Sequence, residues 1–160
     1  MGIRSTVRAI IIRDGKILLN RYDDDRLGGE HFLLPGGGQE QYETMHEAVV
    51  RECLEETGYT VKPARFATVC EVISTDEDYR KNFPNRTHRI HHIFICELLN
   101  IERATPTEQD ETQVGIEWVD INSLAAKDSV PLFPVEVRDN LQDILNGTAS
   151  AFLGSRHQRY

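Results

Sequence analysis

The sequence has few cysteines, no long hydrophobic run and no internal repeat. Its three cysteines are far apart and show no zinc-binding spacing, so neither a zinc site nor a disulfide framework is expected; they are Cys53, Cys70 and Cys96. Their apolar surroundings are typical of buried cysteines in a reducing compartment. No segment could cross a bilayer, and the N-terminus lacks the apolar core of a signal peptide. We therefore expect a cytoplasmic protein.

Basic residues are scarce as well. The 18 lysines and arginines face 26 acidic residues, which gives a formal net charge of −8. A surface of this sign opposes binding to nucleic acid and to anionic membranes, so neither partner is expected. A small phosphorylated substrate is compatible with it, because a bound cation reverses the local field. The length of 160 residues predicts one domain over residues 1–145, followed by a frayed, flexible tail over 146–160.

Strand and helix signals together predict a domain of α/β class with a mixed sheet. The pair Asp14-Gly15 separates two apolar segments and indicates a hairpin turn. The expected strands are residues 6–12, 16–22, 31–34, 65–73, 89–99 and 115–119, and a helical turn over 120–126 and a second helix over 134–145 follow. Between the fourth and fifth strands, the polar residues 74–88 form a candidate substrate loop.

The first helix has clear boundaries. Thr44 and Glu47 have the spacing of a capping box, and Gly58 is suited to the residue after the last turn. A helix between them places Val50, Cys53 and Leu54 on the side that packs against a sheet.

Three carboxylates dominate this helix. Glu52, Glu55 and Glu56 stand at i, i+3 and i+4, so a helix brings them to one face, where they repel each other unless a cation lies among them. Oxygen ligands of this kind suit Mg²⁺ or Mn²⁺. A solvated acidic face is the ordinary explanation for such a short pattern. The glycine turn of residues 36–38 and Glu43 upstream, with Gly58 downstream, favour the metal site instead.

Residues 37–59 match the Nudix box, G-x5-E-x7-R-E-U-x-E-E-x-G-U, in which U is bulky and apolar. Its positions are filled by Gly37, Glu43, Arg51, Glu52, Cys53, Glu55, Glu56, Gly58 and Tyr59. Tyr42 stands where many members of the family have glycine, just before the first glutamate. The chain thus resembles the Nudix hydrolases, including their MutT-like members, and the resemblance extends more weakly from about Thr6 to Phe133.

The resemblance implies an α/β/α sandwich and Mg²⁺-dependent hydrolysis of a nucleoside diphosphate linked to a group X, with Mn²⁺ as a possible substitute. It implies that Glu52, Glu55, Glu56 and the carbonyl of Gly36 hold the metal. It places Glu55 or Glu52 nearest the attacking water, and Arg51 could hold one of the carboxylates. A further base is expected from a loop before Trp118; Glu111 is the first choice, with Glu108, Asp110 and Glu97 as alternatives. The family also makes a homodimer possible.

Substrate contacts are expected from two glycines of the turn, Gly37 and Gly38. They are also expected from three arginines, Arg21, Arg80 and Arg86, although such arginines are commonly solvated on the surface. Markers of two family branches are missing: position 74 is serine rather than the proline of ADP-ribose hydrolases, and Asp76-Glu77 replaces the tyrosine of dinucleoside polyphosphate hydrolases. The purine-reading asparagine of the mutator branch also has no match near Phe133. Elimination favours a nucleoside triphosphate or a similar small nucleotide. A nucleotide-binding module without catalysis and an acidic interaction domain are the alternatives.

Overall fold

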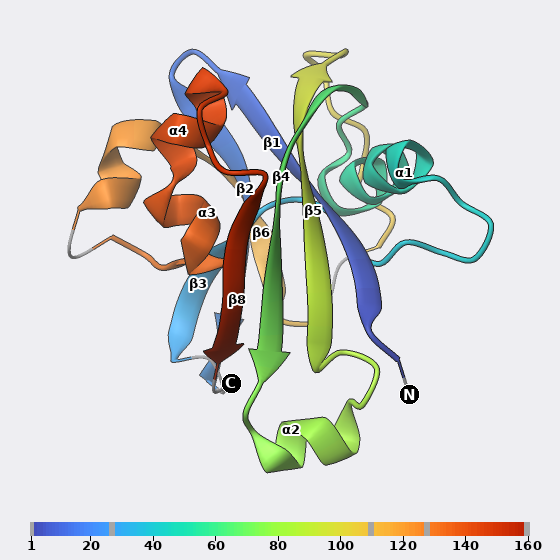
Figure 1. Ribbon diagram of the computed structural model, residues 1–160. Coiled ribbons are helices and arrows are strands. Elements are labelled where there is room, and N and C mark those ends of the chain that lie inside the picture. The colour runs from blue at the N-terminus through green and yellow to red at the C-terminus, as the bar shows by residue number, and fades with distance from the viewer. Residues whose placement is uncertain (1, 26–27, 109–110, 127–128, 159–160) are drawn as a thin grey trace.

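The computed structural model describes residues 2–25, 28–108, 111–126 and 129–158 (Figure 1). Its strands are β1 (Arg4–Arg13), β2 (Lys16–Asp24), β3 (Gly29–Leu33), β4 (Val61–Ser74), β5 (His88–Leu98), β6 (Gln113–Asp120), β7 (Leu132–Phe133) and β8 (Phe152–Gln158). Its helices are α1 (Met45–Thr57), α2 (Glu77–Asn82), the 3-10 helix η2 (Ile121–Ala125), α3 (Val135–Asp139) and α4 (Leu141–Asn146). None of the helices in these described ranges is long and apolar enough to span a membrane.

The strands form one mixed sheet in the order β7-β3-β2-β1-β5-β4-β8, with β6 paired to β2. The pairs β1–β5, β3–β7 and β4–β8 are parallel, whereas the other pairs are antiparallel. This arrangement confirms the predicted mixed sheet. The hairpin between β1 and β2 is also confirmed, with Asp14 and Gly15 both at positive φ (51° and 73°), as its tight turn requires.

The sheet opens between β1 and β2. These strands pair next to their connecting turn, where Ile12 lies opposite Ile17, and farther along β2 the strand β3 takes the place of β1. The segment after β3 then crosses to the free side of β1. There the Val7 amide donates to the Gly37 carbonyl (2.9 Å), and the Ala9 amide donates to the Pro35 carbonyl (2.8 Å). The glycine turn is therefore held by the backbone of β1.

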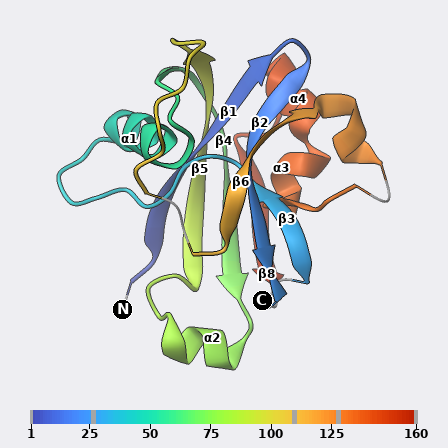
Figure 2. The same ribbon diagram turned by 180° about the vertical axis from the view of Figure 1, so that it is seen from behind.

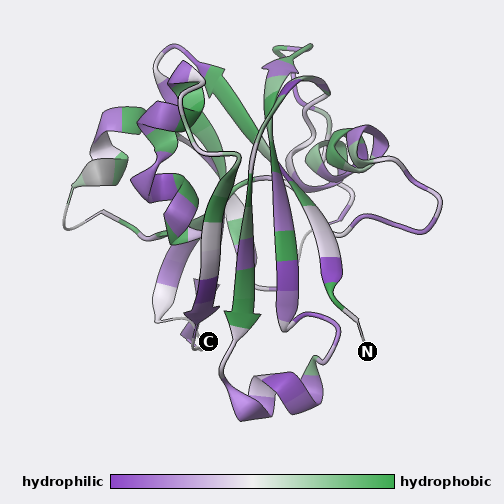
Figure 3. Cartoon of the chain, viewed as in Figure 1, coloured by the Kyte–Doolittle hydropathy of each residue, from purple (hydrophilic) through white to green (hydrophobic). Residues whose placement is uncertain are grey.

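The core lies in two layers, one on each face of the sheet. Figures 1 and 2 show α1 on one side and α3 and α4 on the other. Alternation along β1 supplies both layers, because Val7 and Ala9 face α1 whereas Ile10 faces α3 and α4. Figure 3 shows the apolar residues concentrated in the central strands. Full burial of an aliphatic side chain such as that of Ile10 contributes about 1.5–3 kcal/mol to the stability of the fold.

Helix α1 begins and ends where the sequence predicts. Thr44 is the N-cap and exchanges hydrogen bonds with Glu47 in a capping box, while Gly58 adopts the left-handed conformation at the C-terminal end (φ 75°). The packing face differs from the prediction. Cys53 is fully buried as expected, but Leu54 is exposed, and Glu56 is buried instead. The helix is therefore rotated so that one of its three acids faces the protein interior.

The structure corrects the prediction for the C-terminal part of the chain. The predicted helix over 134–145 is two short helices, α3 and α4, which meet at Asn140. The predicted frayed tail contains β8, which pairs in parallel with β4. Arg156 of β8 also forms an ion pair with Glu136, a buried carboxylate of α3. These contacts attach residues 152–158 to the sheet.

Candidate functional site

The three glycines of the turn each have a different neighbour. A β carbon on Gly36, which has a φ of 134°, would overlap the Val7 carbonyl. A β carbon on Gly37 would lie 2.5 Å from the Glu52 carboxylate, and one on Gly38 would overlap the guanidinium of Arg4. At Gly37 and Gly38, charged side chains therefore lie directly against the main chain, at a distance that only glycine allows because it has no β carbon.

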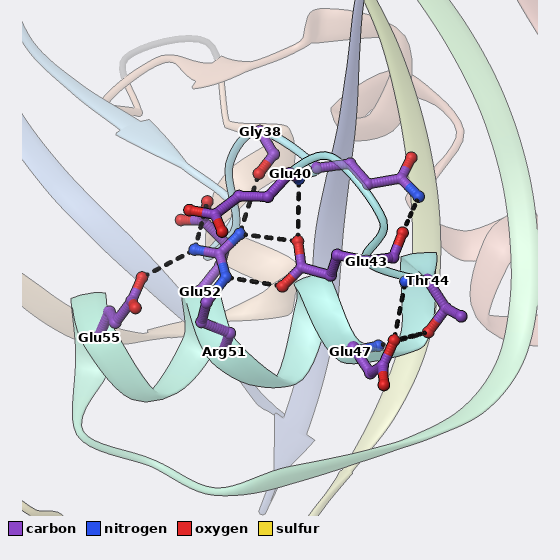
Figure 4. Close-up of polar contacts among 9 residues, drawn as sticks. Gly38, Glu40, Glu43, Thr44, Glu47, Arg51, Glu52 and Glu55 are labelled. Carbon is purple, nitrogen blue, oxygen red and sulfur yellow. Dashed lines mark hydrogen bonds and ion pairs between the residues drawn. The ribbon is translucent and has the colours of Figure 1, made fainter.

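Arg51 connects α1 to the loop that precedes it (Figure 4). Its Nε and Nη2 donate to the two carboxylate oxygens of Glu43, at 2.7 and 3.0 Å. Nη1 lies 2.9 Å from an oxygen of Glu55 and 3.1 Å from one of Glu52, and Nη2 also donates to the Gly38 carbonyl (3.0 Å). The hydrogen bond from Arg51 lowers the pKa of Glu43, and the carboxylate of Glu43 raises the pKa of Arg51. Arg51 is thus the cation that separates the repelling carboxylates.

Glu56 occupies a buried position behind the glycine turn. Only 8% of its surface is exposed, and Oε2 accepts hydrogen bonds from Asn20 Nδ2 (2.6 Å) and the Gly36 amide (2.8 Å). Burial raises the pKa of this carboxyl to about 7, although the nearby charge of Arg8 and the bond from Gly36 oppose the increase. Burial likewise raises the pKa of Glu52, against the opposing effect of Arg51. Both carboxylates are thus held where ionisation is costly without a cation.

Two residues of this site were missed by the sequence analysis. Arg8 Nη1 donates to the carbonyls of Leu34 (2.9 Å) and Gly36 (2.5 Å), while Asn20 orients Glu56. Each is a polar residue inside an apolar strand segment, and both are buried. That pattern, an unexplained polar side chain in a buried strand, was the available signal.

The donor set fits a hard divalent cation. Glu52, Glu56 and the Gly36 carbonyl offer oxygen atoms around one turn of backbone, and Mg²⁺ is commonly bound by one or two carboxylates together with water and substrate phosphates. In the described part of the chain, no group of three or more His, Cys, Asp or Glu side chains converges as a metal site. Glu55 instead points to Arg51. The residues therefore suit a site completed by the substrate.

The candidate bases lie in different places. The backbone amide of Glu108 donates to the Glu55 carbonyl (3.2 Å), which brings this loop to the end of α1. Glu111 is exposed, and Nε2 of Gln113, two residues after it, donates to the Glu56 carbonyl (3.4 Å). Asp110 lies outside the described residues. Glu97 is exposed on β5 opposite Lys62 of β4.

The predicted substrate-binding arginines are not joined to the glycine turn. Arg21 forms an ion pair with Glu30 on the neighbouring strand. Arg80 Nε donates to the Ser74 carbonyl (2.5 Å), and Arg86 is exposed after α2. A hollow of about 320 Å³ lies here, and none of the glutamates of α1 lines it; its lining is Gly2, Ile3, Ile73, Arg80, Pro84, Thr87 and His88. The predicted substrate loop therefore borders a separate hollow.

The chain is similar to several known proteins. The family model described as NUDIX domain matches residues 2–139. An ADP-ribose pyrophosphatase of Methanocaldococcus jannaschii is 36% identical over 118 residues, which cover 74% of this chain and 62% of the relative. A putative ADP-ribose pyrophosphatase of Bacillus subtilis, YjhB, is 30% identical over 106 residues, which cover 66% of this chain and 46% of the relative. The chain thus spans less than two thirds of the length of either relative.

The fold also matches solved structures. A NUDIX hydrolase from Nitrosomonas europaea aligns with a TM-score of 0.70 at 24% identity, and the alignment covers 92% of this chain and 91% of that one. At this level of identity the similarity concerns the fold, which agrees with the predicted mixed α/β sandwich.

Proposed function

The chain belongs to the Nudix family, and from this premise we propose that it is a divalent-metal-dependent pyrophosphohydrolase acting on a nucleoside diphosphate linked to a group X. The observation that supports the proposal most is the buried carboxylate of Glu56, held by Asn20 and Gly36 beside Glu52. A buried carboxylate of raised pKa is stabilised by a bound cation. The family generally uses divalent metals, and the oxygen donors here suit Mg²⁺ or Mn²⁺.

In the proposed site, Glu52, Glu56 and the Gly36 carbonyl would hold the cation, and Glu55, which Arg51 positions, is a carboxylate that could accept a proton. A bound divalent cation neutralises phosphate oxygens and makes water more acidic. The attacking water loses a proton to Glu55 or Glu52. Its oxygen bonds to one phosphorus of the diphosphate, and the bond from that phosphorus to the bridging oxygen breaks. The products are a nucleoside monophosphate and phosphorylated X, or pyrophosphate when the substrate is a triphosphate.

Arg51 is a positioning residue in this scheme. It holds Glu43, Glu55 and the Gly38 carbonyl at once, so it fixes the distance between the turn and the helix. Glu111 and Glu108 remain the candidates for an additional base from the loop before β6, and Glu108 is the one whose backbone contacts Glu55. Two observations bear on which nucleotide is the substrate, and they favour different ones. The absence of the branch markers favours a nucleoside triphosphate, whereas the names of the two relatives, an ADP-ribose pyrophosphatase and a putative one, favour ADP-ribose.

The first prediction concerns Glu55. We expect Glu55→Gln to lower Mg²⁺-dependent turnover by at least roughly a hundredfold, because general base catalysis contributes on this scale. The measurement is product formation from a panel of nucleoside triphosphates, ADP-ribose and sugar nucleotides, with Mg²⁺ or Mn²⁺. Glu117→Gln removes an exposed carboxylate on β6 and serves as the control.

Full activity in Glu55→Gln would remove Glu55 from the mechanism. If the unmodified chain bound nucleotide and metal but turned over no member of the panel, the binding-module alternative would replace the enzyme.

A further inference from the structure

Asn20 is a polar residue in the middle of an apolar strand. Its neighbours along β2, Leu18 and Leu19, are fully buried, and Asn20 is buried as completely. Alternation places Asn20 on the same face of β2 as Leu18, which belongs to the core layer beneath α1. A buried amide costs free energy unless its polar atoms find partners, and a leucine at the same position would avoid that cost. Packing alone therefore does not account for this side chain.

The two polar atoms of the Asn20 amide have different surroundings. Nδ2 donates to Oε2 of Glu56 (2.6 Å), and the same oxygen accepts from the Gly36 amide (2.8 Å). An ionised carboxylate oxygen can only accept, so the group of Asn20 that faces it must be the NH2 group. Oδ1 consequently points elsewhere, and it has no hydrogen-bond partner among the residues that the structure describes. The amide thus leaves a buried acceptor beside Glu56.

A second buried amide, that of Gln113 on β6, also contacts Glu56. Its Nε2 donates to the main-chain carbonyl of Glu56 (3.4 Å), and its Oε1 likewise lacks a partner within the described ranges. The two amides differ in what they hold: Asn20 holds the carboxylate, whereas Gln113 contacts the backbone of α1. Gln113 is therefore the matched comparison for Asn20.

The proposed metal site would supply the donor that Oδ1 lacks. Mg²⁺ gives up its hydration water reluctantly, so it keeps several waters when a protein offers only one or two carboxylates. The O–H groups of these waters need acceptors, and the cation makes them stronger donors by polarising them. Oδ1 lies one amide group away from Oε2 of Glu56, which is within the range of the hydration water of a cation held by that carboxylate.

We propose that Asn20 is a positioning residue for the divalent cation: its nitrogen fixes the Glu56 carboxylate, and its oxygen accepts a hydrogen bond from hydration water of the cation. The inference rests on the proposed function, in which Glu56 is a ligand. It deepens that function by adding a residue of β2, outside the glycine turn and α1, that sets the affinity for the metal. Residues that orient metal ligands typically contribute ten- to a hundredfold to metal affinity.

The first test replaces Asn20 by leucine, which has a similar shape and neither polar atom. We expect the Mg²⁺ dissociation constant of Asn20→Leu, measured by titration calorimetry, to rise roughly ten- to a hundredfold. The Mg²⁺ concentration that gives half-maximal turnover should rise by a similar factor, whereas kcat at saturating Mg²⁺ should fall less. A packing role predicts that neither Mg²⁺ constant changes, and that result would overturn the proposal. If Asn20→Leu does not fold, the smaller and polar Asn20→Ser replaces it with the same expected loss.

A second variant tests where the oxygen points. Asn20→Asp keeps an oxygen at the place of Oδ1 but brings a second carboxylate against Glu56, so its Tm without metal should fall. Mg²⁺ should then raise the Tm of Asn20→Asp by more than it raises that of the unmodified chain, because a cation relieves the repulsion. A smaller or equal gain would contradict the placement of Oδ1 near the cation. Gln113→Leu is the control and should bind Mg²⁺ as the unmodified chain does; a loss equal to that of Asn20→Leu would also overturn the proposal.

Calorimetry needs no substrate, so this proposal and the proposed function can fail separately. If the unmodified chain binds Mg²⁺ without turning over any nucleotide, and Asn20→Leu weakens that binding, the enzyme assignment fails and the role of Asn20 stands. If turnover occurs and Asn20→Leu keeps the Mg²⁺ affinity, the role of Asn20 fails alone. If the unmodified chain binds neither Mg²⁺ nor Mn²⁺, both proposals are overturned.

Discussion

Opposing forces act on the carboxyl of Glu56. Two hydrogen-bond donors and the charge of Arg8 stabilise its ionised form, whereas burial destabilises it and has the larger effect. The pKa in the folded chain is therefore about 7, against 4.5 for an unperturbed glutamate. Between these two values the unfolded chain has lost the proton that the folded chain retains. The folded state then binds more protons, so stability must fall as the pH rises through this range.

This gives a second prediction. Without metal, the free energy of unfolding should decrease between pH 5 and pH 8, by on the order of 3 kcal/mol from Glu56 alone. Glu56→Gln should flatten that part of the profile, because the amide oxygen can still accept from Asn20 and Gly36 while no charge develops. The measurement is urea unfolding at a series of pH values. Glu117→Gln is the control and should leave the profile unchanged.

Repeating the unfolding measurement with Mg²⁺ tests the same carboxylate of Glu56. A cation that binds the ionised carboxylate should stabilise the unmodified chain more at pH 8 than at pH 6, and this difference should disappear in Glu56→Gln. An unchanged pH profile in Glu56→Gln would show that another group causes the dependence.

At the scale of elements, the glycine turn and α1 act as one unit. The turn is fixed to β1 by backbone hydrogen bonds and to α1 by Arg51. Gly37 has no positive φ, so alanine is allowed there by the backbone. What alanine would disturb is the carboxylate of Glu52.

We therefore predict that Gly37→Ala lowers the affinity for Mg²⁺ at least roughly tenfold while changing the free energy of unfolding by about 1 kcal/mol or less. Titration calorimetry and urea unfolding measure the two quantities. Gly38→Ala is the matched comparison, because its β carbon displaces Arg4 rather than Glu52. Equal losses of Mg²⁺ affinity in the two variants would contradict the assignment of Glu52.

Local signals predicted the elements that they control. The capping box at Thr44, the left-handed Gly58 and the hairpin turn at Asp14 depend on neighbours within a few residues, and all three are confirmed. The six-residue helix α2 was missed, since so short a segment has little periodicity. The burial of Glu56 and the exposure of Leu54 depend on how α1 is rotated against the sheet, which no local pattern specifies.

At the scale of the whole molecule, the features that the sequence analysis did not predict depend on pairing between segments that are far apart in the sequence. The strand β8 is mostly exposed and polar, without the alternation of a half-buried strand, and it exists because the edge of β4 offers backbone partners. Arg8 and Asn20 became recognisable as site residues only when the split sheet brought β1 and β2 to the glycine turn. By contrast, the glutamates of α1 were identified from their spacing, and their proposed roles as ligands and base remain predictions.

The last prediction concerns the edge strand. A chain that ends at residue 151 loses the pairing of β8 with β4, the packing of Leu153 and the partner of Glu136. We expect the free energy of unfolding to fall by on the order of 3 kcal/mol and the Tm by about 10 °C. The exposed edge of β4 should also promote aggregation.

Thermal unfolding and light scattering measure these effects. Arg156→Met removes the ion pair with the buried Glu136 while keeping the strand, so the difference between the two losses of stability measures the contribution of the strand pairing. A truncated chain as stable as the unmodified one would show that β8 contributes little to the fold.

The three adjacent glycines also have a genetic consequence. A side chain at Gly38 meets the end of the flexible Arg4, so a second-site suppressor that shortens Arg4 can exist, whereas a side chain at Gly37 meets Glu52, which the proposed metal site needs at full length. A side chain at Gly36 meets the peptide backbone of Val7, which no exchange of residue can trim. During evolution, Gly38 can therefore change together with its partner, whereas neither Gly36 nor Gly37 has a compensating exchange.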